Sequence, residues 1–309
     1  MKKNKKILIL LLVTLSLTGC TKYAKTEDNK VLTNENTGQK IVENIICKPY
    51  DSETLNINED NNIDINKLPA CSEYNMFNTG YEGIWNSLFV KPIAFLIVKL
   101  GQFLRNYGCA IILLTLAIRG ILYPLTNKAA MQSELMNEAK KDLDKLEKKY
   151  IGRDSQEDQM AKSQEMLMIY KKYNINPLSS CLFALIQIPL FFAFYEALNR
   201  LPVVFEGKFL GLELGTSPHT GMSHGNLLYS IIIILVALTT YFSFKLNSAT
   251  NSSDQVQATQ MRMMSNMSIV MITIAAFTTS TSIALYWIAN SAFTIVQNLL
   301  VKIRGKKHA

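Results

Sequence analysis

The residue with the most distinctive chemistry is Arg119, which lies within the apolar run 107–126. A guanidinium in the middle of a membrane costs several kcal/mol unless water or a polar partner relieves it. Lys128 follows nine residues later, about 13 Å along a helix, so Arg119 is not at the end of the run. The one acid in another apolar run, Glu196, lies near the end of that run. We therefore expect Arg119 to face a water-filled cavity open to one side. The alternative is that its side chain extends to the nearer aqueous surface.

Neutral polar side chains in the other apolar runs are candidates for lining such a cavity. They would supply hydrogen bonds that lipid cannot. These residues are Gln187, Thr239, Thr240, Asn290 and Ser291.

Covalent catalysis is not indicated by the remaining residues. The histidines His219, His224 and His308 lie outside the apolar runs, and the sequence has no nucleophile–base pair, Walker A motif or dinucleotide fingerprint. His219 and His224 share a loop but lack further metal ligands beside them. We therefore expect no enzyme activity, no metal and no cofactor.

The N-terminus has the layout of an export signal. Lysines within residues 2–6 precede the apolar run 7–17, which is too short to span a bilayer. The small residues Thr18 and Gly19 then precede Cys20, and this arrangement resembles the lipobox of bacterial lipoproteins. The resemblance implies removal of the signal peptide 1–19 and acylation of the Cys20 thiol, for example with palmitate. The alternatives are a plain signal peptide and an uncleaved anchor.

Lipidation would place residues 20–80 outside the cell. This segment is rich in Asn, Asp, Glu and Lys and poor in aromatic residues, so we expect it to be largely flexible. It contains Cys47 and Cys71, and disulfides persist in that compartment. A disulfide between them is favoured, with two free thiols as the alternative. The sequence has no CxxC pair that would indicate zinc or thioredoxin-type chemistry.

The apolar residues are gathered into blocks long enough to cross a membrane. Of the 309 residues, 49% are hydrophobic and 18% are charged, against about a quarter charged in soluble proteins. The run 263–301 has no charged residue and has room for two spans, with a hairpin at the polar residues 278–282. With the runs 107–126, 178–199 and 226–244, this predicts an all-α integral membrane protein with five transmembrane helices.

Residues 81–106 have a different pattern, typical of an amphipathic helix in the membrane interface. At 100° per residue, a polar arc lies opposite an apolar arc. The polar arc holds Ser87, Lys91, Lys99, Gln102, Arg105 and Asn106, and the apolar arc holds Phe89, Ile93, Leu96, Leu100, Phe103 and Leu104. The alternative is a sixth transmembrane helix.

The distribution of Lys and Arg predicts the orientation. The polar segment 128–176 has ten Lys or Arg residues and nine acids, the tail 304–309 is basic, and the loop 200–225 has two basic residues. The positive-inside rule places 128–176 and the C-terminus in the cytoplasm, and the N-terminus outside.

The sequence of segment 128–176 predicts a helical hairpin with its bend at Gly152. It is either a docking arm or a solvated spacer. The net charge of +8 suits anionic lipid and ribosomal RNA, or simply sets this topology, and nothing indicates a DNA partner.

Three motifs resemble those of the YidC/OxaA-type membrane protein insertases, in order across residues 82–303. The first is Asn106-Tyr107-Gly108-Cys109-Ala110-Ile111-Ile112-Leu113-Leu114 with Ile118-Arg119-Gly120-Ile121-Leu122-Tyr123-Pro124-Leu125. The second is Tyr170-Lys171-Lys172-Tyr173-Asn174-Ile175-Asn176-Pro177-Leu178 with Cys181 and Gln187-Ile188-Pro189-Leu190-Phe191-Phe192. The third is Leu285-Tyr286-Trp287-Ile288-Ala289-Asn290 with Gln297. The family often has proline at Phe183 and in the hairpin at 278–282, where this chain has none.

The resemblance implies an insertase core at 107–303, with a positively charged groove open to the cytoplasm and to lipid. By position, Arg119 matches the groove arginine, and Tyr286 and Trp287 match the aromatic pair of the last span. The short outer segment resembles the Gram-positive type in the bacterial plasma membrane. Implied partners are nascent membrane proteins and the lipid bilayer, with the Sec translocon and the ribosome as further candidates. A secondary transporter or channel is the alternative function, and it would predict paired ionisable groups and internal repeats.

Overall fold

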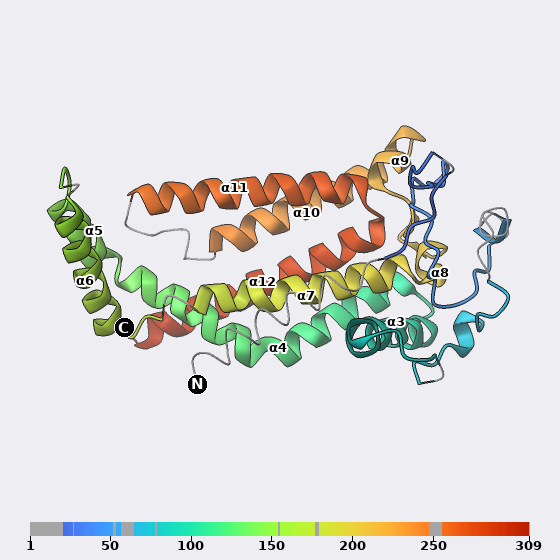
Figure 1. Ribbon diagram of the computed structural model, residues 1–309, viewed down its shortest axis with the longest axis horizontal. Coiled ribbons are helices and arrows are strands. Elements are labelled where there is room, and N and C mark those ends of the chain that lie inside the picture. The colour runs from blue at the N-terminus through green and yellow to red at the C-terminus, as the bar shows by residue number, and fades with distance from the viewer. Residues whose placement is uncertain are drawn as a thin grey trace. The chain divides into compact units, whose positions relative to one another are not determined.

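The computed structural model describes residues 21–26, 28–51, 54–56, 65–77, 79–153, 155–176, 179–246 and 255–308. The signal segment and Cys20 lie outside these residues. The described part is helical apart from isolated bridges and one two-stranded antiparallel sheet, β1 (Lys208–Phe209) with β2 (Leu212–Glu213) (Figure 1). The predicted all-α class is therefore confirmed for this part of the chain.

Five long helices follow the predicted apolar runs. They are α4 (Tyr107–Glu138), α7 (Ser179–Asn199), α10 (Leu228–Leu246), α11 (Gln255–Thr278) and α12 (Thr281–His308). The break between α11 and α12 falls within the polar run in which the hairpin was predicted. By length and composition, Asn86–Leu104, Tyr107–Glu138, Leu228–Leu246 and Thr281–Ile303 are each able to cross a membrane, and Met263–Thr278 is a shorter apolar helix. The number of spans stays a prediction.

Contacts divide the chain into two compact units. The first contains Met1–Ile118, Leu185–Val236 and Thr273–Ala289, and the second contains Arg119–Ala184, Ala237–Ile272 and Asn290–Ala309. Each of the five long helices contributes residues to both units.

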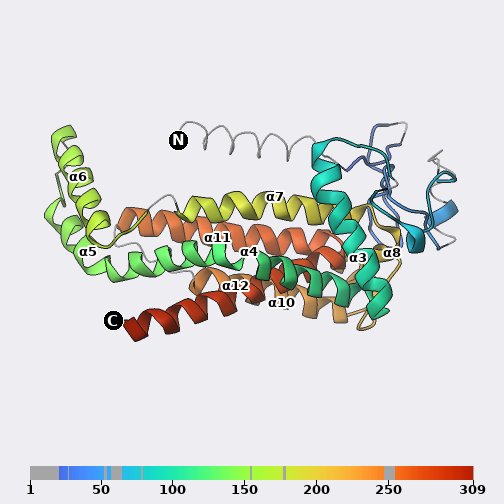
Figure 2. The same cartoon turned by 90° about the horizontal axis from the view of Figure 1, so that it is seen from below.

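The first unit has its core where α3 (Lys91–Leu104) meets the first turns of α4, the end of α7 and the start of α12. Ile97, Ile111, Phe194 and Tyr286 are buried together there. The π-helical turn η2 (Asn86–Val90) precedes α3, and α8 (Pro202–Phe205) closes the core after α7. Within this unit α3 runs across the direction of α7, seen almost end-on in Figure 1 and lengthwise in Figure 2.

The environment of α3 differs from the two arcs that the sequence predicts, because the helix has three faces. One face packs into the core, through Ile93, Ala94, Ile97, Val98 and Gly101. A second face is polar and includes the exposed Lys99 and Gln102. The third face is apolar and exposed, with Leu96 at 41% and Phe103 at 83% exposure. Lys91, predicted to point into water, is instead 2% exposed and bonded to Glu82, since an ion partner lies beside it.

The described residues of the outer segment also differ from the flexible chain that its composition predicts. Val42, Ile45 and Ile65 form a small buried cluster, and isolated β-bridges join residues 23–42. The short 3-10 helix η1 (Cys71–Glu73) lies beside α3. The hydroxyl groups of Tyr23 and Tyr195 share a hydrogen bond of 3.0 Å, which fastens the start of the segment to α7. Other residues of the segment, Ile46, Cys47, Cys71 and Tyr74, join the larger core of the unit.

The second unit contains the predicted polar hairpin. The end of α4 continues through Ala139 into α5 (Lys140–Lys149), and α6 (Gln156–Lys172) returns beside it (Figure 1). The bend lies at Gly152, whose φ of 74° suits glycine. Leu143 and Ile175 are buried together at its base, and two ion pairs, Lys149–Glu165 and Lys172–Asp142, close it at the surface.

Short elements complete the first unit. The loop after α7 carries α8, the hairpin β1–β2 and α9 (Pro218–Ser223), which leads into α10. Ser217 caps α9 by accepting a hydrogen bond from the backbone N–H of Thr220.

Candidate functional site

Arg119 is held by an amide from the last long helix. It lies on α4 with 2% of its surface exposed, and its Nε donates to Oδ1 of Asn290 on α12 at 2.6 Å. The sequence predicts water as the partner of this guanidinium and Asn290 only as a residue in the wall of a cavity. The structure brings the two predicted residues together. Because Asn290 is neutral, this bond orients the guanidinium without cancelling its charge.

A second polar contact joins the same two helices. Nε2 of Gln297 donates to Oγ1 of Thr126 at 3.0 Å, and both side chains are buried. Thr126 follows Arg119 by seven residues, and Gln297 follows Asn290 by seven. Seven residues are close to two helical turns, so each helix presents both of its polar residues on one face. This contact between Thr126 and Gln297 was not predicted from the sequence, although the shared seven-residue spacing is a signal for it.

Gln187, Tyr286 and Trp287 form a separate group in the first unit. Nε2 of Gln187 lies 3.4 Å from the hydroxyl of Tyr286, to which it donates. Trp287 stacks on Phe191 with a centroid distance of 5.5 Å and an interplanar angle of 7°. Tyr286 packs against Phe194 at 4.6 Å. The aromatic pair is therefore fixed against α7, where offset and tilted ring contacts are favourable.

The two predicted threonines of α10 have different environments. Thr240 is 3% exposed, and its hydroxyl has no hydrogen-bond partner among the described residues. Thr239 is only half-buried. A buried hydroxyl without a partner is uncommon in folded proteins and marks a place where water or a ligand group is accommodated.

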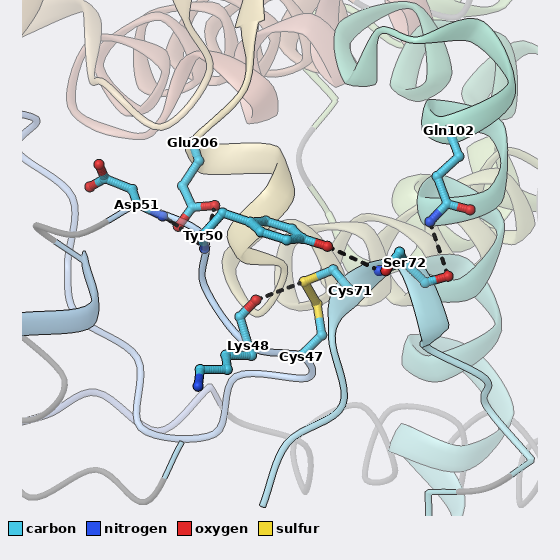
Figure 3. Close-up of a disulfide and its surroundings, with 8 residues drawn as sticks. All are labelled: Cys47, Lys48, Tyr50, Asp51, Cys71, Ser72, Gln102 and Glu206. Atoms are coloured by element: carbon cyan, nitrogen blue, oxygen red, sulfur yellow. Dashed lines mark hydrogen bonds between the residues drawn. A yellow bond between two sulfur atoms is a disulfide. The ribbon is translucent and has the colours of Figure 1, made fainter. Parts of the chain in front are cut away.

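In the outer segment, a disulfide joins Cys47 to Cys71 at the start of η1, and their Cα atoms are 4.8 Å apart (Figure 3). Beside it, the carboxylate of Glu206 accepts hydrogen bonds from the backbone N–H groups of Tyr50 and Asp51. Burial raises the pKa of Glu206, and these two donors oppose that effect. Gln102 of α3 donates to the carbonyl of Ser72 at 3.2 Å. The outer segment is thus bonded both to α3 and to the residue that follows α8.

An ion cluster links the same parts and was not foreseen from the sequence. Glu82 pairs with Lys91 at 3.0 Å and with Arg200 at 2.9 Å, and both cationic side chains are 3% exposed. Arg200 also donates to the carbonyl of Asn44, and Trp85 donates to Glu196. Although burial by itself raises the pKa of Glu82, Arg200 and Lys91 outweigh this and lower it below its ordinary value.

Comparison with known proteins gives a consistent family assignment. Residues 99–308 match the family model of the 60Kd inner membrane protein. The membrane protein insertase YidC of Oceanobacillus iheyensis is 35% identical over 240 residues, which cover 76% of this chain and 90% of that protein. The membrane protein insertase YidC 2 of Bacillus anthracis is 36% identical over 235 residues, covering 75% and 87%.

A solved structure of an active YidC insertase with its first transmembrane domain resolved is more distant. It is 23% identical, with a TM-score of 0.44, and the match covers 79% of this chain and 51% of that one. Similarity at this level is too low to establish a shared fold.

Proposed function

The chain belongs to the 60Kd inner membrane protein family and is a multi-pass bacterial membrane protein insertase, and we propose that it inserts its substrates through a hydrophilic groove built around Arg119. The observation that carries the groove is the buried guanidinium bonded to a neutral amide. A charge is retained inside an apolar run, and Asn290 orients the side chain that bears it. Such a group is a functional candidate by default in a membrane segment.

In this mechanism a substrate helix with a short polar outer tail enters from the cytoplasm. The groove shortens the apolar distance that the tail must cross. Arg119 attracts acidic groups of the tail, and Gln187, Thr239, Thr240 and Asn290 offer hydrogen bonds that lipid cannot supply. Substrate hydrophobicity then drives release into the bilayer. No covalent step and no cofactor are needed.

The charge of Arg119 is tested by comparing Arg119→Lys, Arg119→Ala and Arg119→Glu in a strain depleted of the wild-type protein. Arg119→Lys should insert single-span substrates better than Arg119→Ala, because attraction depends on charge. Substrates with acidic outer tails should lose most, and substrates with neutral tails serve as the matched control. Wild-type insertion of every substrate by both the Ala and the Glu variants would rule out the charge mechanism.

Water access is a separate test of the groove. Cysteines at Thr115, Gln187 and Thr240 should react with a small hydrophilic thiol reagent from the cytoplasm, and they should resist an impermeant reagent applied outside. Reaction from the outside only would overturn the proposed direction of opening.

We also propose that the chain is anchored outside by a lipid on Cys20 and has its C-terminus in the cytoplasm. The small residues before Cys20 and the Lys and Arg distribution support this. Labelled palmitate should enter the wild-type protein and not the Cys20→Ser variant. Equal labelling of the two would contradict lipidation.

The three faces of α3 support its placement in the membrane interface. One face meets protein, one is polar and one is apolar and exposed, and the helix runs across α7 (Figure 2). A helix lying in the interface needs these three environments. For the α5–α6 hairpin we propose a docking role toward the ribosome, the targeting machinery or a nascent chain. Its surface carries a cleft of about 620 Å³ that is lined by the charged pairs at Asp142 and Glu165 and by apolar residues such as Leu146 and Met168.

A further inference from the structure

The hairpin β1–β2 has an unusual residue at its tip. Its two strands pair Lys208 with Glu213 and Phe209 with Leu212, which leaves Leu210 and Gly211 as a two-residue loop. Both loop residues have positive φ, 50° for Leu210 and 82° for Gly211. A turn of this kind favours Asn or Asp followed by Gly, because these residues tolerate the left-handed conformation. Leu210 does not, so its backbone is strained.

The same residue is also among the most exposed large apolar side chains of the described residues. Leu210 is 81% exposed. Strain and exposure together mean that neither the backbone nor the packing of the folded chain favours a leucine here. An asparagine would suit the turn better and would suit water better. The position is therefore explained only by something outside the chain that an apolar side chain contacts.

The hairpin is firmly held, so its tip has a defined position. The hydroxyl of Tyr229, at the start of α10, accepts a hydrogen bond from the backbone N–H of Glu213 at 3.0 Å. The side chain of Asn106, before α4, donates to the carbonyl of Lys208 at 3.4 Å. A Cβ atom at Gly108 would overlap the ring of Phe209, which shows how closely β1 packs on α4.

Those contacts place the tip level with the ends of two apolar helices. Phe103, three residues before Asn106, is 83% exposed, and Leu227, two residues before Tyr229, is 72% exposed. The helices that begin beside the hairpin, Tyr107–Glu138 and Leu228–Leu246, are both long and apolar enough to cross a membrane. Phe103, Leu210 and Leu227 are thus exposed apolar side chains near the starts of two helices that are able to cross a membrane.

We infer that Leu210 is a wedge that inserts into the outer leaflet of the lipid bilayer. Phe103 and Leu227 enter the leaflet beside it, and Lys208, paired with Glu213 and largely exposed, stays among the headgroups. The wedge holds the start of α4 and the start of α10 at a fixed depth. The inference rests on the proposed orientation, in which this end of the helices faces the outside.

The depth of residue 210 is measured on the full chain in vesicles of phosphatidylglycerol and phosphatidylcholine. A nitroxide is attached at Leu210→Cys in a background with Cys109→Ala and Cys181→Ala, and its collisions with oxygen and with a water-soluble nickel complex are compared. Glu35→Cys on the polar outer turn serves as the aqueous control, and Leu235→Cys on α10 as the lipid control. We expect residue 210 to lose most of the nickel collisions seen at residue 35 and to gain oxygen collisions, as residue 235 does.

A second variant separates anchoring from folding. Leu210→Asn relieves the strain and should leave the thermal unfolding temperature in detergent unchanged or higher, while a nitroxide at Lys208→Cys moves toward water. Nickel collisions at residue 210 as frequent as at residue 35 would overturn the inference, and so would an immobilised label shielded from both reagents, which indicates a protein partner. Insertion activity of each variant is measured separately. A result against the insertion of Leu210 into the lipid is therefore distinguishable from a result against the proposed insertase function.

Discussion

Replacing Glu82 by glutamine should selectively destabilise the outer part of the first unit. Lys91 and Arg200 each have 3% of the side chain exposed, whereas Glu82 has 42%. Removing one partner of a fully buried pair costs about 3–5 kcal/mol, because the other charge stays buried. Since water reaches Glu82, we expect about 2–3 kcal/mol for Glu82→Gln, in which Lys91 loses this ion partner while Arg200 keeps Glu196 at 3.5 Å.

The cost is measurable as a change in the free energy of unfolding. Urea titration would follow the fluorescence of Trp85, which is 2% exposed and donates to Glu196 in the same cluster, in a Trp287→Phe background. Glu213→Gln is the matched control. Its partner Lys208 is 69% exposed and Glu213 itself 48% exposed, so that pair contributes about 0–1 kcal/mol.

The pH dependence has a definite sign. Because the pKa of Glu82 is lowered in the folded protein, its stabilisation is fully present above the ordinary pKa of glutamate. It is lost as the pH falls through the lowered value. The difference between the wild type and Glu82→Gln should therefore vanish in acid. Equal costs for Glu82→Gln and Glu213→Gln, or a difference that persists unchanged in acid, would refute the reasoning.

Two further predictions concern buried positions in the outer part of the same unit. Changing Cys47 and Cys71 together to serine should lower the free energy of unfolding of the outer segment by about 3.5 kcal/mol, since the bond closes a loop across a separation of 24 residues. Urea titration with and without reductant checks this. An effect of reductant on the double variant would contradict it. Gly101→Ala should cost about 1–3 kcal/mol, because the new Cβ overlaps the ring of Tyr107. Gly80→Ala, where a Cβ meets nothing within 4 Å, is its control, and equal thermal unfolding temperatures would disprove the clash.

The sequence predicted the long helices well because each depends on a continuous apolar run. Arg119 was found as a functional candidate for the same reason, since a charge is conspicuous in such a run. Its contact with Asn290 was not predicted, because that contact depends on how two helices distant in sequence align. The shared seven-residue spacing to Thr126 and Gln297 narrows the alignment but does not fix it.

The outer segment was harder to predict, for a different physical reason. Composition measures whether a chain can fold alone, and residues 21–80 have too few apolar residues for that. The described residues among them pack against the rest of the unit instead, for example through Arg200, which donates to the carbonyl of Asn44, 156 residues away. The third face of α3 was missed similarly. A two-way division into polar and apolar positions cannot distinguish apolar residues that meet protein from those that meet lipid.

The hydrogen bond between Tyr23 and Tyr195 changes what a lipid on Cys20 would do. Tyr23 lies three positions after Cys20, which allows about 10 Å of chain between them. The acyl chains would therefore occupy one sector of the lipid annulus, beside the outer end of α7. The outer segment would then be fixed at both ends and would not act as a flexible tether. A protein already held in the membrane by several helices would gain little further retention from such a lipid. It would instead keep a covalently attached acyl chain beside α7.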